Sequence, residues 1–254
     1  MFQLNRHYII KLIMKYMGSK NRISKSILPI ILKDRTDEYY IEPFVGGCNM
    51  IDKVDGKRIG GDNNYYLIEM WKGLQNNNKR PYTITKDLYS SARSEYNFIK
   101  KGKEIDREFS DFLIGWIGWM GSYNGRFFDG GYSGHSVGKT NRDYISEQIR
   151  NTESQIDKIG SVIFKHSSYE NLDIPNGSII YCDIPYNNTK KYSTSKGFDY
   201  DKFWEWCRVI SKENEVFISE YEAPDDFKCI WEREVTNSMN TTKTYKPTEK
   251  LFTI

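Results

Sequence analysis

Short apolar segments that end in glycine or in an acid constrain the fold more than any other feature of this chain. Residues 38–44, "EYYIEPF", are followed after Val45 by the pair Gly46 and Gly47, and residues 57–62 end in Asp62. Such segments, each leading into a turn and a helix, are typical of a parallel α/β sheet. At the carboxyl edge of that sheet, glycines let a ligand approach the backbone, and an acid roughly 20 residues on accepts ribose hydroxyls. Two adjacent glycines also make an ordinary turn, so this pattern alone leaves both interpretations open.

The same alternation of helix and strand continues along the chain, with one interruption. We expect helices over 20–33, 63–75, 83–102, 107–120, 141–159 and 199–211, strands over 161–166, 177–183 and 215–219, and a final hairpin over 229–254. Between 72 and 160 the pattern becomes mainly helical and, after residue 121, rich in glycine. We therefore predict an N-terminal extension (1–13), a catalytic domain in two parts (14–71 and 161–254), and an inserted lobe (72–160).

Composition excludes several classes of protein. Aromatic residues make up 15% of the 254 residues, which favours a folded globular chain over a disordered one. No apolar run approaches the roughly 20 residues of a transmembrane helix, so no membrane partner is expected. Four cysteines (Cys48, Cys182, Cys207 and Cys229) form no CxxC pair, which argues against a zinc site and predicts no metal. Reduced thiols place the protein in the cytoplasm.

The small net charge of +3 is concentrated in the inserted lobe. Residues 72–160 hold 14 Lys and Arg against 11 Asp and Glu, so the excess within this segment equals that of the whole chain. A basic lobe favours contact with a polyanion. A solvated surface of mixed charge explains the same count equally well.

The sequence "YCDIPY" places a carboxylate at the end of a later strand. Asp183 should therefore lie on the same edge of the sheet as Asp62. A carboxylate, a carbonyl held by proline geometry and an aromatic ring suit an exocyclic amino group. Asp183 and the carbonyl of Ile184, which precedes Pro185, would accept its two N–H bonds, and Tyr186 would stack on its ring. Capping, turn formation and rim packing are the structural alternatives for these residues.

The motifs "YMGSK", "EPFVGGCNM", "GGDNN" and "YCDIPY", in that order, resemble those of the Dam-type family of adenine-specific DNA N6-methyltransferases. The resemblance covers nearly the whole chain from Met14 to Ile254. It implies a Rossmann-like α/β methyltransferase sheet with an inserted, mainly helical target-recognition lobe. It also implies S-adenosylmethionine as methyl donor and double-stranded DNA as substrate, with the target adenine flipped out of the duplex.

The resemblance assigns roles residue by residue. It implies cofactor contacts at Tyr16, Lys20, Phe44, Gly46, Gly47, Asp62, Tyr169 and Asp183, and catalysis by Asp183, Ile184, Pro185 and Tyr186. Ile184, Cys48 and Glu220, which stands where a family member often has asparagine, depart from the family pattern, and the middle loop lacks the phenylalanine-asparagine-proline signature of the GATC-reading members. Ile184 stands where a proline is usual, and Cys48 takes the third position of the glycine loop. A backbone carbonyl at Ile184 can still accept a hydrogen bond.

The glycine-rich segment 122–142 is the candidate for reading the target. We expect DNA contacts from Tyr123, Arg126, Phe127, Lys139 and Arg142, with Phe128 and Tyr132 as further aromatic candidates. The cationic residues would contact phosphates or guanine edges, and the aromatic residues would fill the gap left by a flipped base. Exposed charge and packing within the lobe are the alternatives for each residue.

Other functions use the same amino-group clamp. A methyltransferase acting on cytosine N4 in DNA, on adenine in RNA or on glutamine in a protein would carry the same tetrapeptide. A DNA-binding relative that has lost catalysis is a rival of a different class. The order of the motifs and the inserted lobe favour DNA adenine. Whether the enzyme acts alone or with a cognate restriction enzyme is left open.

Overall fold

The computed structural model describes residues 13–136, 141–186, 197–235 and 248–254, and these form two compact units. The sheet unit holds residues 18–78 and 158–254, and the helical unit holds residues 79–157 with the segment before Gly18. Residues 14–17 therefore group with the helical unit, and residues 72–78 and 158–160 with the sheet unit, which differs from the boundaries expected at 14, 72 and 160. The predicted N-terminal extension, apart from its last residue, lies outside the described residues.

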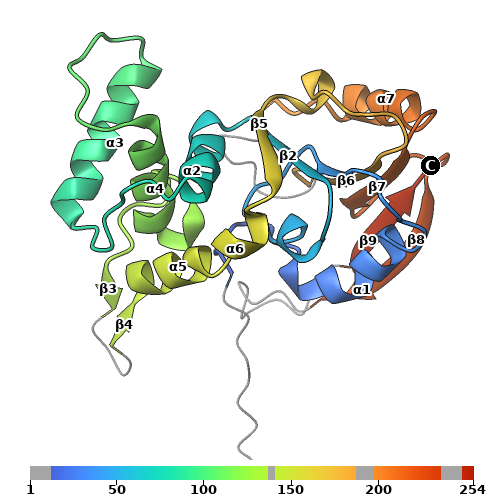
Figure 1. Cartoon of the computed structure of the whole chain (residues 1–254), viewed down its shortest axis with the longest axis horizontal. Helices are drawn as coiled ribbons and strands as arrows, with labels where there is room; N and C mark the ends of the chain where they lie inside the picture. The colour runs from blue at the N-terminus through green and yellow to red at the C-terminus, as the bar shows by residue number, and fades with distance from the viewer. Residues whose placement is uncertain (1–12, 137–140, 187–196, 236–247) are drawn as a thin grey trace, which may run out of the picture. The chain divides into compact units, whose positions relative to one another are not determined.

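The sheet unit is built on a seven-stranded sheet with the order β5-β2-β1-β6-β7-β9-β8 (Figure 1). Its strands are β1 (Tyr40–Glu42), β2 (Arg58–Asp62), β5 (Val162–His166), β6 (Ile179–Asp183), β7 (Glu215–Glu220), β8 (Lys228–Glu234) and β9 (Thr248–Thr253). The first five strands of that order are parallel, and β9 is antiparallel to both of its neighbours. This confirms the predicted Rossmann-like α/β sheet. The strand order reverses between β1 and β6, which is where such sheets bind ligands.

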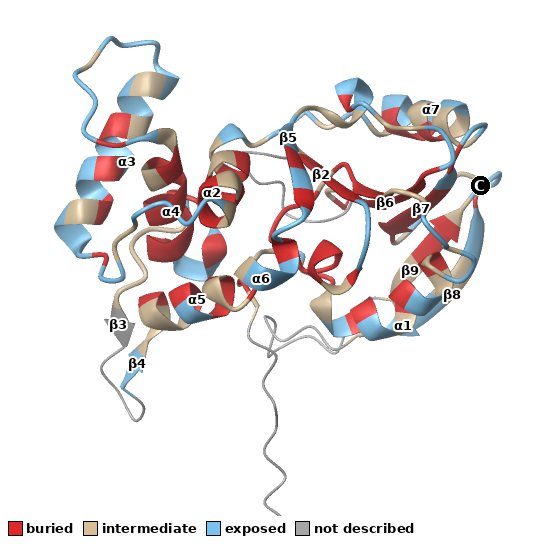
Figure 2. Ribbon diagram, viewed as in Figure 1, coloured by how far each residue is buried: buried red, intermediate tan, exposed pale blue. Residues whose placement is uncertain are grey.

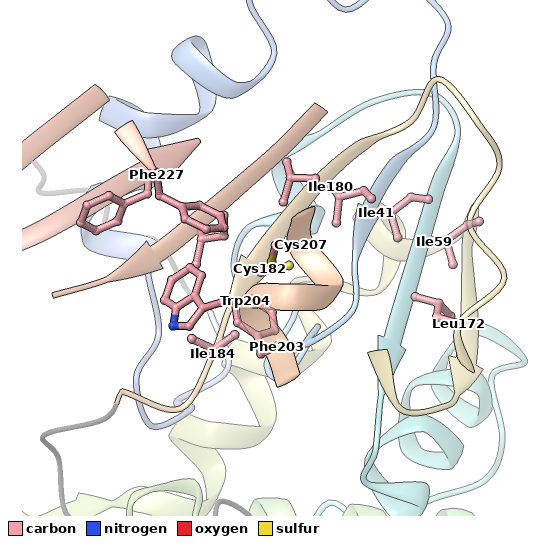
Figure 3. Close-up of a cluster of buried hydrophobic side chains, with 13 residues drawn as sticks. Ile41, Ile59, Leu172, Ile180, Cys182, Ile184, Phe203, Trp204, Cys207 and Phe227 are labelled. Atoms are coloured by element: carbon pink, nitrogen blue, oxygen red, sulfur yellow. The ribbon is translucent and has the colours of Figure 1, made fainter. Parts of the chain in front are cut away.

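Alternate residues of each strand point to opposite faces of the sheet, and this periodicity sets the direction of the candidate site residues. Helix α7 (Tyr200–Ile210) buries Phe203 and Cys207 in a cluster that includes Ile180 and Cys182 of β6 (Figure 3). Because Ile180 and Cys182 face this cluster, Asp183 at the end of the same strand points away from it. Helix α1 (Asn21–Ile31) presents its own apolar stripe and continues through Pro29.

The chain leaves and re-enters the sheet unit at one place. Helix α2 (Tyr65–Gln75) ends the first segment of this unit, and the short helix α6 (Ile156–Ile159) leads into the second. The amide of Gln75 donates hydrogen bonds to the carbonyls of Ile159 and Val162, both at 2.8 Å. The side chain of Gln75 therefore joins the two points between which the helical unit is inserted.

The helical unit contains α3 (Lys86–Lys100), α4 (Asp111–Gly121) and α5 (Tyr144–Glu153), with a small hairpin of β3 (His135–Ser136) and β4 (Arg142–Asp143). Thr85, Ser110 and Asp143 cap the three helices through side-chain oxygens. Helix α4 is buried along almost its whole length (Figure 2), so "WIGWM" forms the core of this unit. No helix in the described part of the chain combines the length and the apolar character needed to cross a bilayer.

Two predicted elements of the 121–159 segment differ from the structure. The helix expected over 141–159 is divided, because Asp143 ends β4 and caps α5, and α5 ends at Glu153 before α6 begins. The segment expected to be an irregular loop contains β3 and a single helical turn at Tyr123–Gly125. A two-residue strand has no periodicity that a sequence pattern could show.

Candidate active site

Two strands of the parallel sheet each end in an aspartate at the carboxyl edge of the sheet. Asp62 is the last residue of β2 and Asp183 the last residue of β6, and β1 pairs with both strands. Partial burial raises the pKa of each carboxyl to about 6. At neutral pH both groups are therefore ionised, but each is within reach of protonation under mildly acidic conditions.

The loop after β1 wraps around Asp62. The amide of Gly46 donates to Oδ2 of Asp62 at 3.1 Å, and the amide of Asn64 donates to Oδ1 at 2.9 Å. Gly46 has a φ of +47°, a conformation that glycine adopts without strain, and its carbonyl accepts the indole N–H of Trp71 at 3.0 Å. Gly47 is buried beside it. A carboxylate offers about four acceptor sites, so Asp62 retains capacity for the hydroxyls of a ribose.

The next position of this loop is strained. Cys48 is fully buried and has a φ of +56°, in the left-handed region that non-glycine residues rarely occupy. Glycine would adopt this backbone conformation without strain. The following residue, Asn49, donates to the hydroxyl of Ser19 at 2.7 Å, which ties the glycine loop to the "MGSK" segment.

Aromatic residues gather after β1 and β5. Phe44 and Tyr169 lie with ring centroids 5.5 Å apart, and both contact Phe198. Tyr169 also meets Trp206 of α7 edge-on at 5.1 Å. The two predicted aromatic cofactor contacts therefore belong to one half-buried cluster in the sheet unit.

The tetrapeptide after β6 is joined to Lys20 and to a residue that its sequence did not indicate, Glu249 on β9. The ammonium of Lys20 lies 3.1 Å from Oδ1 of Asp183 and 3.7 Å from Oε2 of Glu249. It also lies 4.2 Å from the ring centroid of Tyr186, whose hydroxyl donates to Oε2 of Glu249 at 2.6 Å. Lys20 is only 6% exposed, whereas the side chain of Asp183 remains 25% exposed. One ammonium is thus held between two carboxylates and an aromatic face.

The other residues of the tetrapeptide hold its backbone. The side chain of Ile184 is buried in the cluster under α7 (Figure 3), and the carbonyl of Pro185 accepts the hydroxyl of Tyr200 at 2.7 Å. Tyr186 is 8% exposed and meets the ring of Tyr221 at 4.5 Å. Burial, together with the neighbouring acids, raises the pKa of the Tyr186 hydroxyl well above its usual value, so it stays a hydrogen-bond donor.

The predicted residues of the helical unit fall into two groups. Tyr123 is 50% exposed and Arg126 is exposed, so both can reach a ligand. Phe127 is 8% exposed and Phe128 is 2% exposed, and their rings pack 4.9 Å apart in the core of this unit. Their burial favours packing within the helical unit over contact with DNA.

Further contacts hold the remaining candidates of this unit. Tyr16 packs against Trp119 with centroids 5.2 Å apart, and the hydroxyl of Tyr132 donates to the carbonyl of Ile84 at 2.8 Å. Arg142 is exposed and makes a bidentate pair with Glu147 at 2.7 and 2.8 Å, which lowers the pKa of that carboxyl to about 2. Lys139 lies outside the described residues.

Glu249 and Tyr200 are the site residues that sequence reasoning missed. Glu249 stands 63 positions from Tyr186 in the chain, in a strand where acidic and basic residues follow one another. No spacing rule links two residues that only the antiparallel return of β9 brings together. Tyr200 was expected only as part of a helix.

Comparison with known proteins identifies one family. A sequence model described as "D12 class N6 adenine-specific DNA methyltransferase" matches residues 16–213. Two solved structures of the rRNA methyltransferase aviRa from Streptomyces viridochromogenes align over 91% and 92% of this chain and over 83% and 84% of theirs. Both have a TM-score of 0.39 and 8% sequence identity, a likeness that carries no argument about function.

Proposed function

The chain belongs to the D12 class of N6 adenine-specific DNA methyltransferases, and we propose that its methyl transfer takes place between Asp62 and Tyr186 at the carboxyl edge of the sheet. The family establishes an enzyme that methylates adenine N6 in DNA. The observation that carries the proposal is the position of Asp183. It ends β6 next to Tyr186, on the same edge as the loop that wraps Asp62.

S-adenosylmethionine is the methyl donor that this family implies, and the residues present suit it. Asp62 has acceptor capacity for two ribose hydroxyls, and Phe44 and Tyr169 offer ring surfaces for an adenine. Gly46 and Gly47 place no side chain between this loop and a ligand. When bound, the donor supplies an electrophilic methyl group.

Asp183 and the carbonyl of Ile184 make the adenine amino nitrogen a better nucleophile. The lone pair of an adenine amino nitrogen is delocalised into the ring, which makes the nitrogen a poor nucleophile. Two acceptors that pull on its N–H bonds localise the lone pair toward the incoming methyl group. As the new N–C bond forms, the old S–C bond breaks, and the nitrogen then loses a proton to solvent or to Asp183. The product ammonium is acidic enough that no strong base is required.

The ammonium of Lys20 has to move during this reaction. Its ammonium now lies on the face of Tyr186 and pairs with Asp183, the two groups that we assign to the adenine. A flipped base therefore enters as the ammonium moves away. The resemblance assigns Lys20 to the cofactor, whose carboxylate would offer it a new partner.

Recognition of DNA falls to the helical unit in this proposal. Tyr123 and Arg126 are exposed on the turn that follows α4. We assign Tyr123 to the gap left by the flipped base and Arg126 to a phosphate or a guanine edge. Double-stranded DNA in the cytoplasm is the substrate we propose, with a cognate restriction enzyme as an optional partner.

The experiment uses purified protein and methyl-labelled S-adenosylmethionine with, in separate reactions, plasmid DNA from a host without adenine or cytosine methylation and RNA transcribed from the same plasmid. Digestion to nucleosides should place the label in N6-methyladenine. The variant Asp183→Ala should transfer none. Label in N4-methylcytosine, or label in RNA but not DNA, would contradict the proposed acceptor, and normal turnover by Asp183→Ala would contradict the assigned site.

A further inference from the structure

The acid that holds the hydroxyl of Tyr186 lies outside the segment that matches the family. Glu249 is the second residue of β9, whereas the family match ends at residue 213. Its side chain is 14% exposed, and Oε2 accepts the Tyr186 hydroxyl at 2.6 Å. A hydrogen bond of this length from a neutral hydroxyl to a carboxylate is of the strong, charge-assisted kind.

The topology of the sheet explains how a residue so late in the chain reaches the site. Parallel strands β6 and β7 both end at the carboxyl edge, with Asp183 paired to Ser219. Strand β9 runs antiparallel to β7, with Glu220 paired to Lys250, so its beginning lies where β7 ends. An antiparallel strand thus brings its first residues to the edge where the parallel strands finish.

The distances show which contact of Glu249 is the stronger. Lys20 lies 3.7 Å from Glu249 but 3.1 Å from Asp183, so Asp183 is the closer partner of the ammonium. The hydroxyl of Tyr186 is 2.6 Å from Glu249. The main hydrogen bond of Glu249 in this cluster is therefore the one to Tyr186.

We propose that Glu249 is a positioning residue for methyl transfer, which fixes the orientation of the Tyr186 ring by accepting its hydroxyl hydrogen bond. This inference rests on the proposed function, in which the ring of Tyr186 receives the flipped adenine. Tyr186 is the third residue after the end of β6, so its ring is fixed less by the sheet than by its contacts. A ring anchored at its hydroxyl presents one orientation to a base, and small errors in the placement of reacting groups cost much of the rate.

The test compares Glu249→Ala, Glu249→Gln, Tyr186→Phe and the double variant Glu249→Ala/Tyr186→Phe in steady-state methyl transfer. Glu249→Ala should lower kcat about tenfold or more and leave the KM for the donor within about twofold. Glu249→Gln should recover most of kcat, because an amide oxygen also accepts the hydroxyl. Tyr186→Phe breaks the same bond from its other end, so the double variant should be no slower than the slower single variant.

Glu234→Ala is the matched control, since it removes an exposed acid from the neighbouring strand β8. Unchanged kcat in Glu249→Ala would overturn the inference, and so would an effect of Glu249→Ala that is equally large in the Tyr186→Phe background. If Glu249→Ala does not fold, Glu249→Gln and Tyr186→Phe decide: the inference fails when Tyr186→Phe turns over normally. Failure of the proposed function is distinct, because it appears as normal turnover by Asp183→Ala.

Discussion

The ammonium of Lys20 lies 3.1 Å from Oδ1 of Asp183, so the carboxylate that we assign to the substrate forms an ion pair with a cation of the protein. The same ammonium covers the ring of Tyr186 at 4.2 Å. Lys20 therefore contacts both of the side chains that we assign to the adenine. This arrangement keeps an acid near the end of β6 ionised although only a quarter of its side chain is exposed.

Replacing Asp183 should lower the rate of methyl transfer far more than the affinity for the methyl donor. Asp183→Asn keeps the size of the side chain but removes the charge and replaces one acceptor by a donor. We expect methyl transfer to fall by about 10²-fold or more, the effect of losing one preset hydrogen-bonding group in a transition state. Donor affinity should change far less, which equilibrium dialysis with labelled donor would measure. A variant that keeps more than a tenth of the turnover would contradict this role.

Donor binding should weaken in acid because Asp62 must be ionised to accept two hydroxyls. Burial raises the pKa of this carboxyl to about 6. As the pH falls below that pKa the acceptor is lost, so affinity should be constant above about pH 7 and fall roughly tenfold per unit below about pH 6. Titration calorimetry over that range would measure it.

The same pH series in two variants locates the titrating group. Asp62→Asn should bind weakly with little pH dependence, whereas Asp183→Asn should keep the dependence of the natural protein. If donor affinity in Asp62→Asn still falls with decreasing pH, the titrating group is not Asp62.

Tyr123 and Phe127 should behave in opposite ways although they are only four residues apart. Phe127→Ala removes a ring that is 8% exposed, and we expect a loss of about 3–5 kcal/mol of unfolding free energy. Tyr123→Ala removes a half-exposed ring and should leave stability within about 0.5 kcal/mol. Thermal denaturation would measure both.

Turnover of Tyr123→Ala should then fall on fully paired DNA. The deficit should shrink when the target adenine is mismatched, because an unpaired base costs less to flip. Tyr82→Ala removes another exposed aromatic residue of the same unit and serves as the control. An equal deficit on paired and mismatched substrates would argue against a role in filling the gap.

The strained residue of the glycine loop gives a prediction about stability alone. Cys48 has a φ of +56°, and alanine keeps the strain of that conformation while glycine relieves it. Both substitutions remove the sulfur atom, and glycine also removes the buried Cβ, so the difference between them is the relieved strain less the loss of that one carbon. The unfolding free energy of Cys48→Gly should exceed that of Cys48→Ala by about 1–2 kcal/mol. Urea denaturation would show this, and an alanine variant as stable as the glycine variant would contradict it.

Most of the sheet unit could be predicted because local patterns determine it. The apolar segments before Glu42, Asp62 and Asp183 all form strands of one parallel sheet, and α7 buries the face that its periodicity indicates. These elements are consistent in propensity, turn chemistry and burial. The order of the motifs was enough to identify the family.

The details of the site could not be predicted, since they arise from tertiary contacts. The hydrogen bond between Glu249 and Tyr186 depends on the antiparallel course of β9, which no local pattern encodes. Phe127 and Tyr123 have similar aromatic character in the sequence, and only packing distinguishes the buried ring from the exposed one. Cys48 shows that a residue can occupy a backbone conformation its own preferences oppose.

Gln75 gives the chain a further property through its hydrogen bonds to the backbone before and within β5. A segment whose two ends are clasped together can change its length at little entropic cost, because closure entropy grows only slowly with length. Insertions and deletions within residues 79–157 should therefore cost the sheet unit little stability.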